Sequence, residues 1–386
     1  MKNSIPFIFI LSMMFAQQEC DNGRYNTEIF SNVNVTSEIF YGSNTNSDFF
    51  GDVEEDLYLD IYEPDGDNLD NRPLVIFLFG GAYIGGSRTS PDIVELCTRY
   101  AKMGYVAAAI DYRLTLDLVW LSTEANAYKA AAKGVHDLKG AIRYFRMNDE
   151  LYDDYNIDSD RIYAGGVSAG AISAVNAAYL NLESELPSFL EDYFEDNGGT
   201  EGNSGNPGYA SEFHGVINLC GAVGHTDWII ENDIPIVSLH GTEDEVVPYG
   251  DGMITLLGLN MNVMGSYSIH NRMVALGNNS AFLSWDGVDH TPFVSSAAFM
   301  DETVEFSANF IHDLACATSF MLGDLNIDST LNILDVILLV NVILDPSQAS
   351  DQIMEAGDLN GDATLNVLDI ISLVNMILSS PLRNIP

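Results

Sequence analysis

Basic side chains are scarce in this sequence. It has 15 Lys and Arg residues against 56 Asp and Glu residues, so its formal net charge at pH 7 is -41. A surface this acidic repels phosphate backbones and anionic lipids, so we expect no nucleic acid among its partners. We interpret the acidity as a solubility feature, suited to a salty environment in which repulsion between like charges is screened.

Long apolar segments and closely spaced CxxC cysteines are also lacking. After the N-terminus, no segment offers the roughly eighteen uncharged apolar residues that a membrane span requires, so we expect no membrane span. The four cysteines include no CxxC pair, which argues against a zinc site. One or two disulfides are expected in an oxidising compartment, and the sequence leaves open how they pair Cys20, Cys97, Cys220 and Cys316.

The N-terminus has the pattern of an export signal. Lys2 supplies a positive charge, an apolar stretch ends at Phe15, and Ala16 offers a cleavage site. We therefore predict a signal peptide over residues 1–16 and a secreted, extracellular protein. Lipid attachment at Cys20 is disfavoured, because the residues directly before it are polar.

Buried strands and amphipathic helices alternate along most of the chain. This alternation predicts the α/β class, with a mostly parallel sheet flanked by helices. The strands are expected at residues 56–64, 73–81, 105–113, 161–168, 215–223, 234–241 and 281–287, and the helices at 91–103, 123–148 and 169–182. Residues 183–212 interrupt the rhythm with an acidic, glycine-rich stretch, for which a lid or substrate-contacting loop and a plain surface insertion both stay open.

The pattern Gly166-x-Ser168-x-Gly170 is the first candidate for chemistry. Alone it is a weak signal, because a passive serine in a glycine-rich turn has the same letters. Here it follows an apolar strand and precedes an alanine-rich helix, which is the context of a nucleophile elbow. We predict that Ser168 is a nucleophile and that the N–H of Ala169 donates to an oxyanion.

A serine nucleophile needs a histidine to take its proton and a carboxylate to orient that histidine. Asp244 is the predicted carboxylate, because the turn after a strand should direct it inward while its acidic neighbours Glu243 and Glu245 face water. His240, at the end of that strand, is expected to brace Asp244.

The predicted base is His290, in the loop after the last predicted strand. Of the seven histidines, it is the one that completes the chain order Ser168, Asp244, His290 of an α/β-hydrolase. The remaining oxyanion donors should come from the glycine-rich loop LFGGAYIGGS, where the backbone can approach a substrate closely.

Residues 55–312 resemble the α/β-hydrolase superfamily, in particular its carboxylesterase-like members. The four motifs above occur in the order found there. The resemblance implies that Gly81 and Ala82 supply oxyanion donors beside Ala169, and that catalysis needs no cofactor. The sequence departs from many relatives at Phe79, where they have His, and at Ala82, where they have Gly.

The C-terminal part is a duplication. GDLNIDSTLNILDVILLVNVIL begins at Gly323 and GDLNGDATLNVLDIISLVNMIL at Gly357, which marks a separate module with a boundary near Phe320. It resembles a dockerin, an all-α module with two EF-hand-like calcium loops. Hard oxygen ligands at this spacing suit calcium, which we expect as a structural ion at two sites. The implied ligands are Asp324, Asn326, Asp328, Thr330 (carbonyl), Asn332 and Asp335 in the first loop, and Asp358, Asn360, Asp362, Thr364 (carbonyl), Asn366 and Asp369 in the second.

The dockerin resemblance also implies a cohesin-type partner. The loop positions that contact a cohesin in dockerins carry Ile333-Leu334 and Val367-Leu368 here. These apolar pairs are interpreted either as a docking surface or as the module's own core. Position six of each loop, usually Gly, holds Ser329 and Ala363, which should weaken calcium binding.

Together these patterns predict a secreted serine carboxylesterase with a calcium-binding docking module. The expected domains are residues 25–317 for the esterase and 321–381 for the dockerin-like module. Acetyl or feruloyl esters of plant polysaccharide are the first substrate expectation, because dockerins commonly accompany polysaccharide degradation. The alternatives are a lipid or polyester hydrolase and, from another class, a catalytically silent hydrolase fold that serves as an adhesion or scaffold protein.

Overall fold

The computed structural model describes residues 20, 22–48, 51–115, 121–255, 260–316, 322–325, 331–346 and 351–379. The chain divides into two compact units, Met1–Cys316 and Ala317–Pro386. The predicted signal peptide at residues 1–16 lies outside the described residues.

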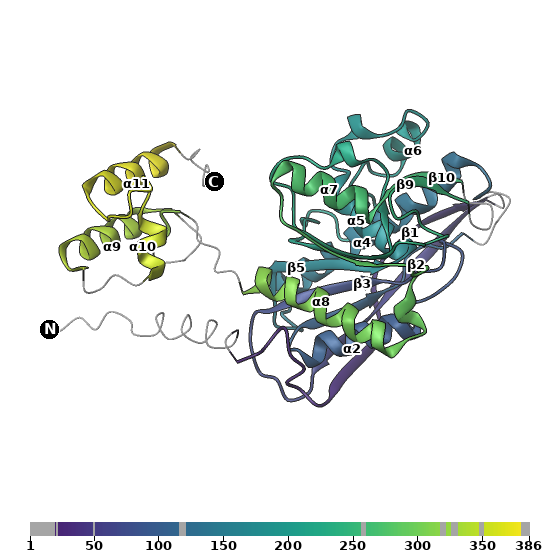
Figure 1. The fold of residues 1–386 in the computed structure, drawn as a ribbon, viewed down its shortest axis with the longest axis horizontal. Helices are drawn as coiled ribbons and strands as arrows, with labels where there is room; N and C mark the ends of the chain where they lie inside the picture. The colour runs from purple at the N-terminus through teal and green to yellow at the C-terminus, as the bar shows by residue number, and fades with distance from the viewer. Residues whose placement is uncertain are drawn as a thin grey trace. The chain divides into compact units, whose positions relative to one another are not determined.

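The larger unit is built on an eight-stranded sheet with the strand order β1-β2-β4-β3-β5-β6-β8-β11 (Figure 1). β1 pairs antiparallel with β2 and β2 antiparallel with β4, whereas all other neighbours in the sheet are parallel. The predicted α/β class is therefore confirmed. The strands are β1 (Val33–Asp48), β2 (Gly51–Pro64), β3 (Arg72–Leu78), β4 (Val106–Ile110), β5 (Ile157–Val167), β6 (Val216–Leu219), β8 (Ile236–Gly241) and β11 (Ser280–Trp285).

Helices cover both faces of this sheet, so its central strands are buried on both sides. Every residue of β3 and β4 is buried, which explains why β4 and the part of β3 after Arg72 are continuous apolar runs. In Figure 1, α2 and α8 lie on one face of the sheet and α4, α5 and α7 on the other. The helices are α2 (Pro91–Lys102), α4 (Glu124–Leu151), α5 (Ala169–Tyr179), α6 (Glu191–Asp196), α7 (Ser266–Leu276) and α8 (Ala297–Ala315), with short 3-10 turns η1 (Glu183–Glu185), η2 (Thr226–Trp228) and η3 (Pro292–Val294).

One predicted strand was wrong in its extent. The apolar stretch 215–223 is interrupted at Cys220, whose φ of 56° lies in the left-handed region, so β6 ends at Leu219. After this break the chain leaves the main sheet and enters a three-stranded sheet of order β7-β10-β9. Its strands are β7 (Ala222–Val223), β9 (Asp251–Ile254) and β10 (Met261–Gly265).

The second half of the 183–212 stretch is held firmly against α4. Ser204 Oγ donates to Asp137 Oδ1 over 2.6 Å, Lys139 Nζ donates to Glu201 Oε1 over 2.8 Å, and Arg143 Nε donates to the Gly205 carbonyl over 3.0 Å. Asp137 is fully buried and is also paired with Arg113. These contacts favour an anchored insertion over a lid for this half.

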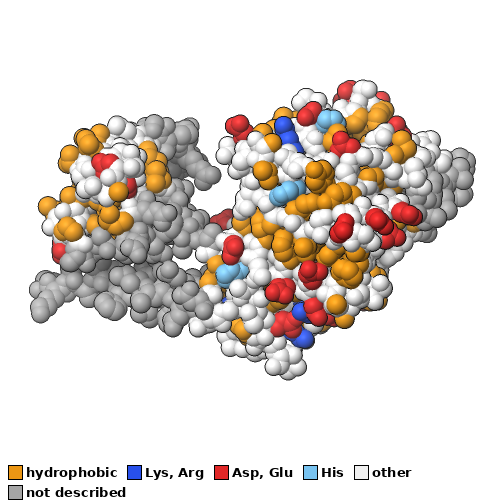
Figure 2. Space-filling model, viewed as in Figure 1, with side chains coloured by type: hydrophobic (Ala, Val, Ile, Leu, Met, Phe, Trp, Pro, Cys, Tyr) orange, Lys and Arg blue, Asp and Glu red, His pale blue; other side chains and the backbone are white. Residues whose placement is uncertain are grey.

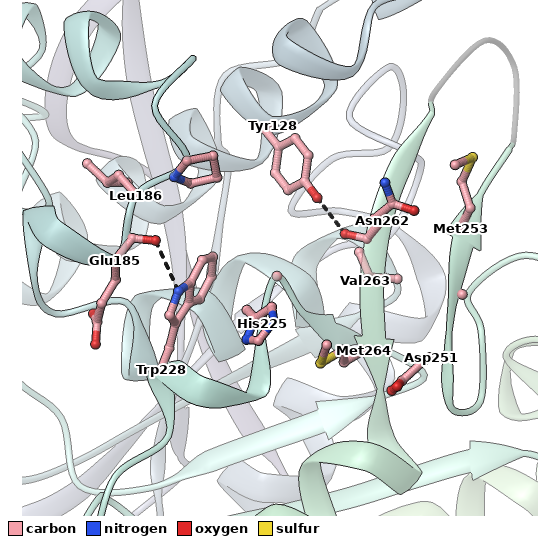
Figure 3. Close-up of a pocket in the computed structure, with 13 residues that line it drawn as sticks. Tyr128, Glu185, Leu186, His225, Trp228, Asp251, Met253, Asn262, Val263 and Met264 are labelled. Carbon is pink, nitrogen blue, oxygen red and sulfur yellow. Dashed lines mark hydrogen bonds between the residues drawn. The ribbon is translucent and has the colours of Figure 1, made fainter.

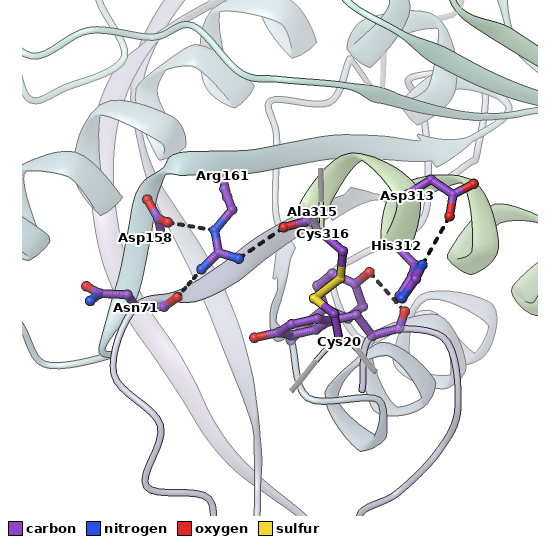
Figure 4. Close-up of a disulfide and its surroundings, with 10 residues drawn as sticks. Cys20, Asn71, Asp158, Arg161, His312, Asp313, Ala315 and Cys316 are labelled. Carbon is purple, nitrogen blue, oxygen red and sulfur yellow. Dashed lines mark hydrogen bonds and ion pairs between the residues drawn. A yellow bond between two sulfur atoms is a disulfide. The ribbon is translucent and has the colours of Figure 1, made fainter. Parts of the chain in front are cut away.

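A disulfide joins Cys20 to Cys316, whose Cα atoms lie 6.0 Å apart (Figure 4). It closes the larger unit at the end of α8, next to Ala315, whose carbonyl accepts a hydrogen bond from Arg161 over 3.1 Å. Cys97 and Cys220 are free and buried. The sulfur of Cys20 is used in this bond, which agrees with the expectation that it carries no lipid.

The smaller unit is all-α within its described residues, with α9 (Ile333–Leu344), α10 (Asp351–Gly357) and α11 (Val367–Ser379). Leu325, Leu339 and Leu373 form the centre of its own small core. Throughout the described parts of the chain, no helix is long and apolar enough to cross a membrane. On the face shown in Figure 2, acidic side chains outnumber basic ones, and hydrophobic side chains gather in a band across the larger unit.

Candidate active site

Ser168 stands at the sharp turn between β5 and α5. Its φ of 54° and ψ of -115° are unfavourable for a residue with a side chain, as a nucleophile elbow requires. The flanking glycines leave the turn room. A Cβ on Gly166 would lie 2.7 Å from the Leu78 carbonyl oxygen, and one on Gly170 would lie 2.3 Å from the same atom. Only glycine fits at both positions, because β3 and the turn approach so closely.

The structure brings the three residues of the predicted triad together. His290 Nε2 lies 2.9 Å from Ser168 Oγ, and His290 Nδ1 lies 2.6 Å from Asp244 Oδ2. Asp244 is fully buried at its side chain, and the His290 side chain is 14% exposed. Ser168 is half-buried, so a substrate can reach its hydroxyl group. Asp244 and His290 are 46 positions apart in the sequence, and Ser168 and His290 are 122 positions apart. The three side chains nevertheless form one hydrogen-bonded line.

Asp244 is held by donors on both carboxylate oxygens. The N–H groups of Val246 and Val247 each donate to Oδ1 over 2.8 Å, and His240 Nε2 lies 3.0 Å from Oδ2. Burial alone would raise the pKa of Asp244, but the hydrogen bonds from His240 and His290 lower it well below its usual value. The carboxylate is therefore ionised at neutral pH and can stabilise a protonated His290.

The neighbouring acids do not compete for this position. Glu243 and Glu245 are both exposed, as the sequence led us to expect.

The glycine-rich loop after β3 passes directly beside the nucleophile. A Cβ on Gly80 would lie 3.3 Å from Ser168 Cβ. Gly81 and Ala82 both have positive φ values, 133° and 54°, which turn the backbone sharply at the predicted donor positions. Within the described residues, no hydrogen bond engages the N–H of Gly81, Ala82 or Ala169. The three N–H groups thus lack a protein partner there, as the proposed role of oxyanion donor requires.

Two tyrosines, which the motifs did not single out, fix this loop. Tyr83 Oη donates to the Ala169 carbonyl over 2.8 Å and lies 3.2 Å from Ser173 Oγ, so it ties the loop to the first turn of α5. Tyr112 Oη donates to the Phe79 carbonyl over 2.9 Å, and the two rings stack with centroids 4.3 Å apart. Phe79, which replaces the histidine of many relatives, is thereby packed in the core beneath the loop.

Cys220 lies next to the triad. Its sulfur, a carboxylate oxygen of Asp244 and a ring nitrogen of His290 all lie within 4.8 Å of one another, a grouping that in principle could hold a metal ion. Burial raises the pKa of the Cys220 thiol to about 12, so without a metal the sulfur is protonated at neutral pH.

A separate cavity of about 700 Å³ opens on the same unit (Figure 3). Its walls come from the first part of the 183–212 stretch, the η2 turn, the β9–β10 hairpin and the start of α4. Tyr128 Oη donates to the Asn262 carbonyl over 2.6 Å on one side, and Trp228 Nε1 donates to the Glu185 carbonyl over 3.1 Å on the other. The lining mixes aromatic and apolar surfaces with the polar side chains of His225, Asp251 and Asn262.

The second loop of the smaller unit has the form of a calcium loop. Asp358 accepts hydrogen bonds from the N–H groups of Asp362, over 3.0 Å, and Ala363, over 2.7 Å, so the loop folds back on the first of the predicted ligands. Ala363 at position six has a φ of 60°, the left-handed conformation for which glycine is usual. Asp369 at position twelve is fully buried. These hard oxygen donors fit calcium.

The first loop is described only in part. Its ligand candidates Asp324, Asn332 and Asp335 are described, with Asp335 fully buried. Asn326, Asp328 and Thr330 lie outside the described residues.

The apolar pairs at the cohesin positions are on the surface. Ile333 and Leu334 are 64% and 53% exposed, and Val367 and Leu368 are 62% and 56% exposed. This exposure favours a docking surface over the module's own core.

Comparisons with known proteins find similarity in a segment of each unit. Residues 59–219 match the family model BD-FAE, and residues 322–378 match the Dockerin type I domain. No curated protein matches the chain significantly. Similar solved structures include esterase 2 of Thermogutta terrifontis phosphonylated by cyclosarin, with 21% identity, a TM-score of 0.51, and coverage of 74% of this chain and 95% of that chain. The apo form of that enzyme has 21% identity and a TM-score of 0.50, covering 75% of this chain and 97% of that chain. At this identity the likeness shows the fold.

Proposed function

We propose that the chain is a serine carboxylesterase, in which a segment similar to BD-FAE is followed by a segment similar to the Dockerin type I domain. The observation that carries the proposal is the hydrogen-bonded line from Asp244 through His290 to Ser168. The proposed catalytic domain covers residues 25–317 and the docking module residues 321–381.

In the proposed mechanism, His290 Nε2 accepts the Ser168 proton as the serine oxygen attacks an ester carbonyl. Asp244 holds the other ring nitrogen and stabilises the imidazolium that forms. The N–H groups of Gly81, Ala82 and Ala169 donate to the oxyanion. His290 then gives its proton to the leaving alcohol, and water, deprotonated by the same imidazole, releases the acyl group from Ser168.

We propose that the substrate is an acetyl or feruloyl ester on plant polysaccharide. The dockerin module supports this substrate, because it would attach the enzyme to a polysaccharide-degrading assembly. The cavity of Figure 3 is lined by none of the three triad residues, and we propose it as a subsite for the non-reacting part of the substrate. A sugar ring has apolar C–H faces and hydroxyl groups, and the faces of Tyr128 and Trp228 beside Asp251 and Asn262 complement both. We therefore place the sugar part of the substrate there.

The docking module is proposed to act outside the cell after export through the 1–16 signal. Dockerin type I domains bind calcium, and the proposed ions, one in each loop, hold the loops that begin α9 and α11. The exposed pairs Ile333-Leu334 and Val367-Leu368 are the proposed contacts to a cohesin.

The test is turnover of p-nitrophenyl acetate by the wild type and by Ser168→Ala. Removing the nucleophile should lower kcat by at least about a thousandfold. Equal rates for the wild type and Ser168→Ala would contradict the esterase proposal and favour a catalytically silent adhesion or scaffold protein. A panel of acetyl-xylan, feruloyl-oligosaccharide, long-chain lipid and polyester substrates then decides the ester class, with preference for the last two supporting the lipid or polyester hydrolase.

A further inference from the structure

The carboxylate of Asp244 contacts a second imidazole besides that of His290, namely the ring of His240. On its other side, this ring is hydrogen-bonded to Ser266, which contacts Asn218. We propose that Asn218, Ser266 and His240 form a hydrogen-bond chain of fixed direction. In this chain each residue sets the proton position of the next, and the last, His240, positions the catalytic carboxylate. The inference rests on the proposed function, since it assigns positioning residues to the same site.

The chain starts at Asn218 on β6, where a backbone group fixes the orientation of the side-chain amide. The N–H of Gly221 donates to Asn218 Oδ1 over 2.9 Å, so that atom must be the oxygen. Asn218 Nδ2 then faces two hydroxyl groups, Ser238 Oγ and Ser266 Oγ, each at 3.0 Å. All three side chains are fully buried. The amide therefore donates to both serines.

Ser266 Oγ accepts from Asn218, so its own hydrogen is left to donate elsewhere. Two atoms are within reach: His240 Nδ1 at 2.7 Å and the Gly221 carbonyl oxygen at 3.4 Å. The shorter and better bond goes to the histidine. Since Nδ1 accepts that hydrogen, the proton of a neutral His240 must be on Nε2.

The far side of His240 requires the same tautomer. Nε2 lies 3.0 Å from Asp244 Oδ2 and 3.1 Å from the Val247 carbonyl oxygen. Both oxygens are acceptors, so a protonated Nε2 is attracted to each, whereas the other tautomer would direct a lone pair at two buried oxygens. The hydrogen bonds that start at Gly221 and the acceptors around Asp244 thus both require the proton of His240 to be on Nε2.

The consequence is a fixed rotation of the catalytic carboxylate. Asp244 Oδ2 receives His240 from one side and His290 Nδ1, at 2.6 Å, from the other, while Oδ1 is held by two backbone N–H groups. Because His290 follows the orientation of Asp244, Ser266 and Asn218 act on the nucleophile through His240. They touch neither substrate nor reacting atoms and are positioning residues.

The experiment compares Ser266→Ala with Ser238→Ala. Both remove a buried hydroxyl group that accepts from Asn218 Nδ2, but only Ser266 contacts His240. Nitrogen NMR of the full chain labelled with ¹⁵N-histidine reports the tautomer of His240, identified by its loss in His240→Gln. The wild type should show a protonated Nε2 and an unprotonated Nδ1. Ser266→Ala should lose this pattern and lower kcat by about tenfold with KM nearly unchanged, because the chemical step and not binding depends on the carboxylate.

Several results would overturn the inference: a wild-type His240 protonated on Nδ1, an unchanged spectrum and kcat in Ser266→Ala, or the same spectral change in Ser238→Ala. If Ser266→Ala does not fold, Asn218→Asp replaces it. That nearly isosteric carboxylate can only accept, so Ser266 turns its hydrogen towards residue 218 and His240 Nδ1 becomes protonated. An unaltered His240 spectrum in that variant contradicts the proposed hydrogen-bond chain. A wild type without Ser168-dependent turnover would refute the proposed function. The His240 spectrum would still test the hydrogen-bond chain independently of that function.

Discussion

The hydroxyl group of Tyr83 donates to the carbonyl oxygen of Ala169 over 2.8 Å and so joins the glycine-rich loop to the helix that follows the nucleophile. The loop contributes Gly81 and Ala82, and the helix contributes Ala169, to the proposed oxyanion hole. One buried hydrogen bond therefore sets the distance between the two sources of donors.

Tyr83→Phe should lower kcat for p-nitrophenyl acetate by about tenfold, because the donors are no longer held where the oxyanion forms. The matched control is Tyr100→Phe, since Tyr100 is equally buried and donates to Ser307 Oγ over 2.8 Å on α8. Each variant should lose about 1 kcal/mol of unfolding free energy, measured by urea denaturation. If both lower kcat alike, the effect is one of stability and not of the oxyanion loop.

The buried His136 makes stability depend on pH. Its Nε2 lies 2.9 Å from the Gly199 carbonyl, and burial, aided by the nearby positive charge of Arg113, lowers its pKa to about 3. In the unfolded chain the pKa returns to about 6.5. Between these values the unfolded state binds more protons, so this contribution to stability is complete above pH 6.5 and is lost as pH falls towards 3.

The measurement is the free energy of unfolding in denaturant at several pH values from 7 to 4. His136→Gln should reduce the loss of stability per pH unit by up to about 1.4 kcal/mol relative to the wild type. His225→Gln, at an exposed histidine, serves as the control for the removal of one histidine. A His136→Gln slope equal to that of the wild type would refute this role.

Ala363→Gly should tighten calcium binding in the second loop. Ala363 has a φ of 60°, which costs a residue with a Cβ about 1 kcal/mol and glycine almost nothing. The dissociation constant of that loop should fall about fivefold, as measured by titration calorimetry of the full chain. The first loop is unchanged and provides the internal reference. Weaker binding by the variant would show that the loop changes conformation when calcium enters.

Tyr128→Ala should reveal the substrate group that the cavity receives. The ring lines the cavity, and its loss should lower kcat/KM for an ester carried on an oligosaccharide more than for p-nitrophenyl acetate. Tyr152→Ala, at an exposed tyrosine that does not line the cavity, is the control. An equal loss with both esters would separate the cavity from substrate binding.

Features that depend on residues close together in the sequence could be predicted from it. The glycines around Ser168 and the acidic turn at Asp244 are local patterns with one strict geometry each, so their letters identified the residues that the structure places within hydrogen-bonding distance. The alternation of apolar runs likewise predicted the parallel strands. β1 was missed because its many Asn, Ser and Thr residues resemble a loop.

Features that arise where distant segments meet were out of reach. Asn218, Ser266 and His240 lie on β6, α7 and β8, and no local pattern relates them. The pairing of Cys20 with Cys316 spans 296 residues, and nothing in the sequence favours it over the other possible pairings of the four cysteines. The break at Cys220 depends on a left-handed backbone that a buried apolar stretch does not reveal.

The most direct test of the central claim is mass spectrometry of the acyl-enzyme. Wild-type protein and His290→Ala are mixed with p-nitrophenyl acetate, quenched in acid within milliseconds and digested. The wild type should carry one acetyl group, on the peptide that contains Ser168 and on that residue, whereas His290→Ala should carry none at the same time. An acetyl group elsewhere, or rapid turnover with Ser168 never acylated, would contradict the assignment of Ser168 as the nucleophile.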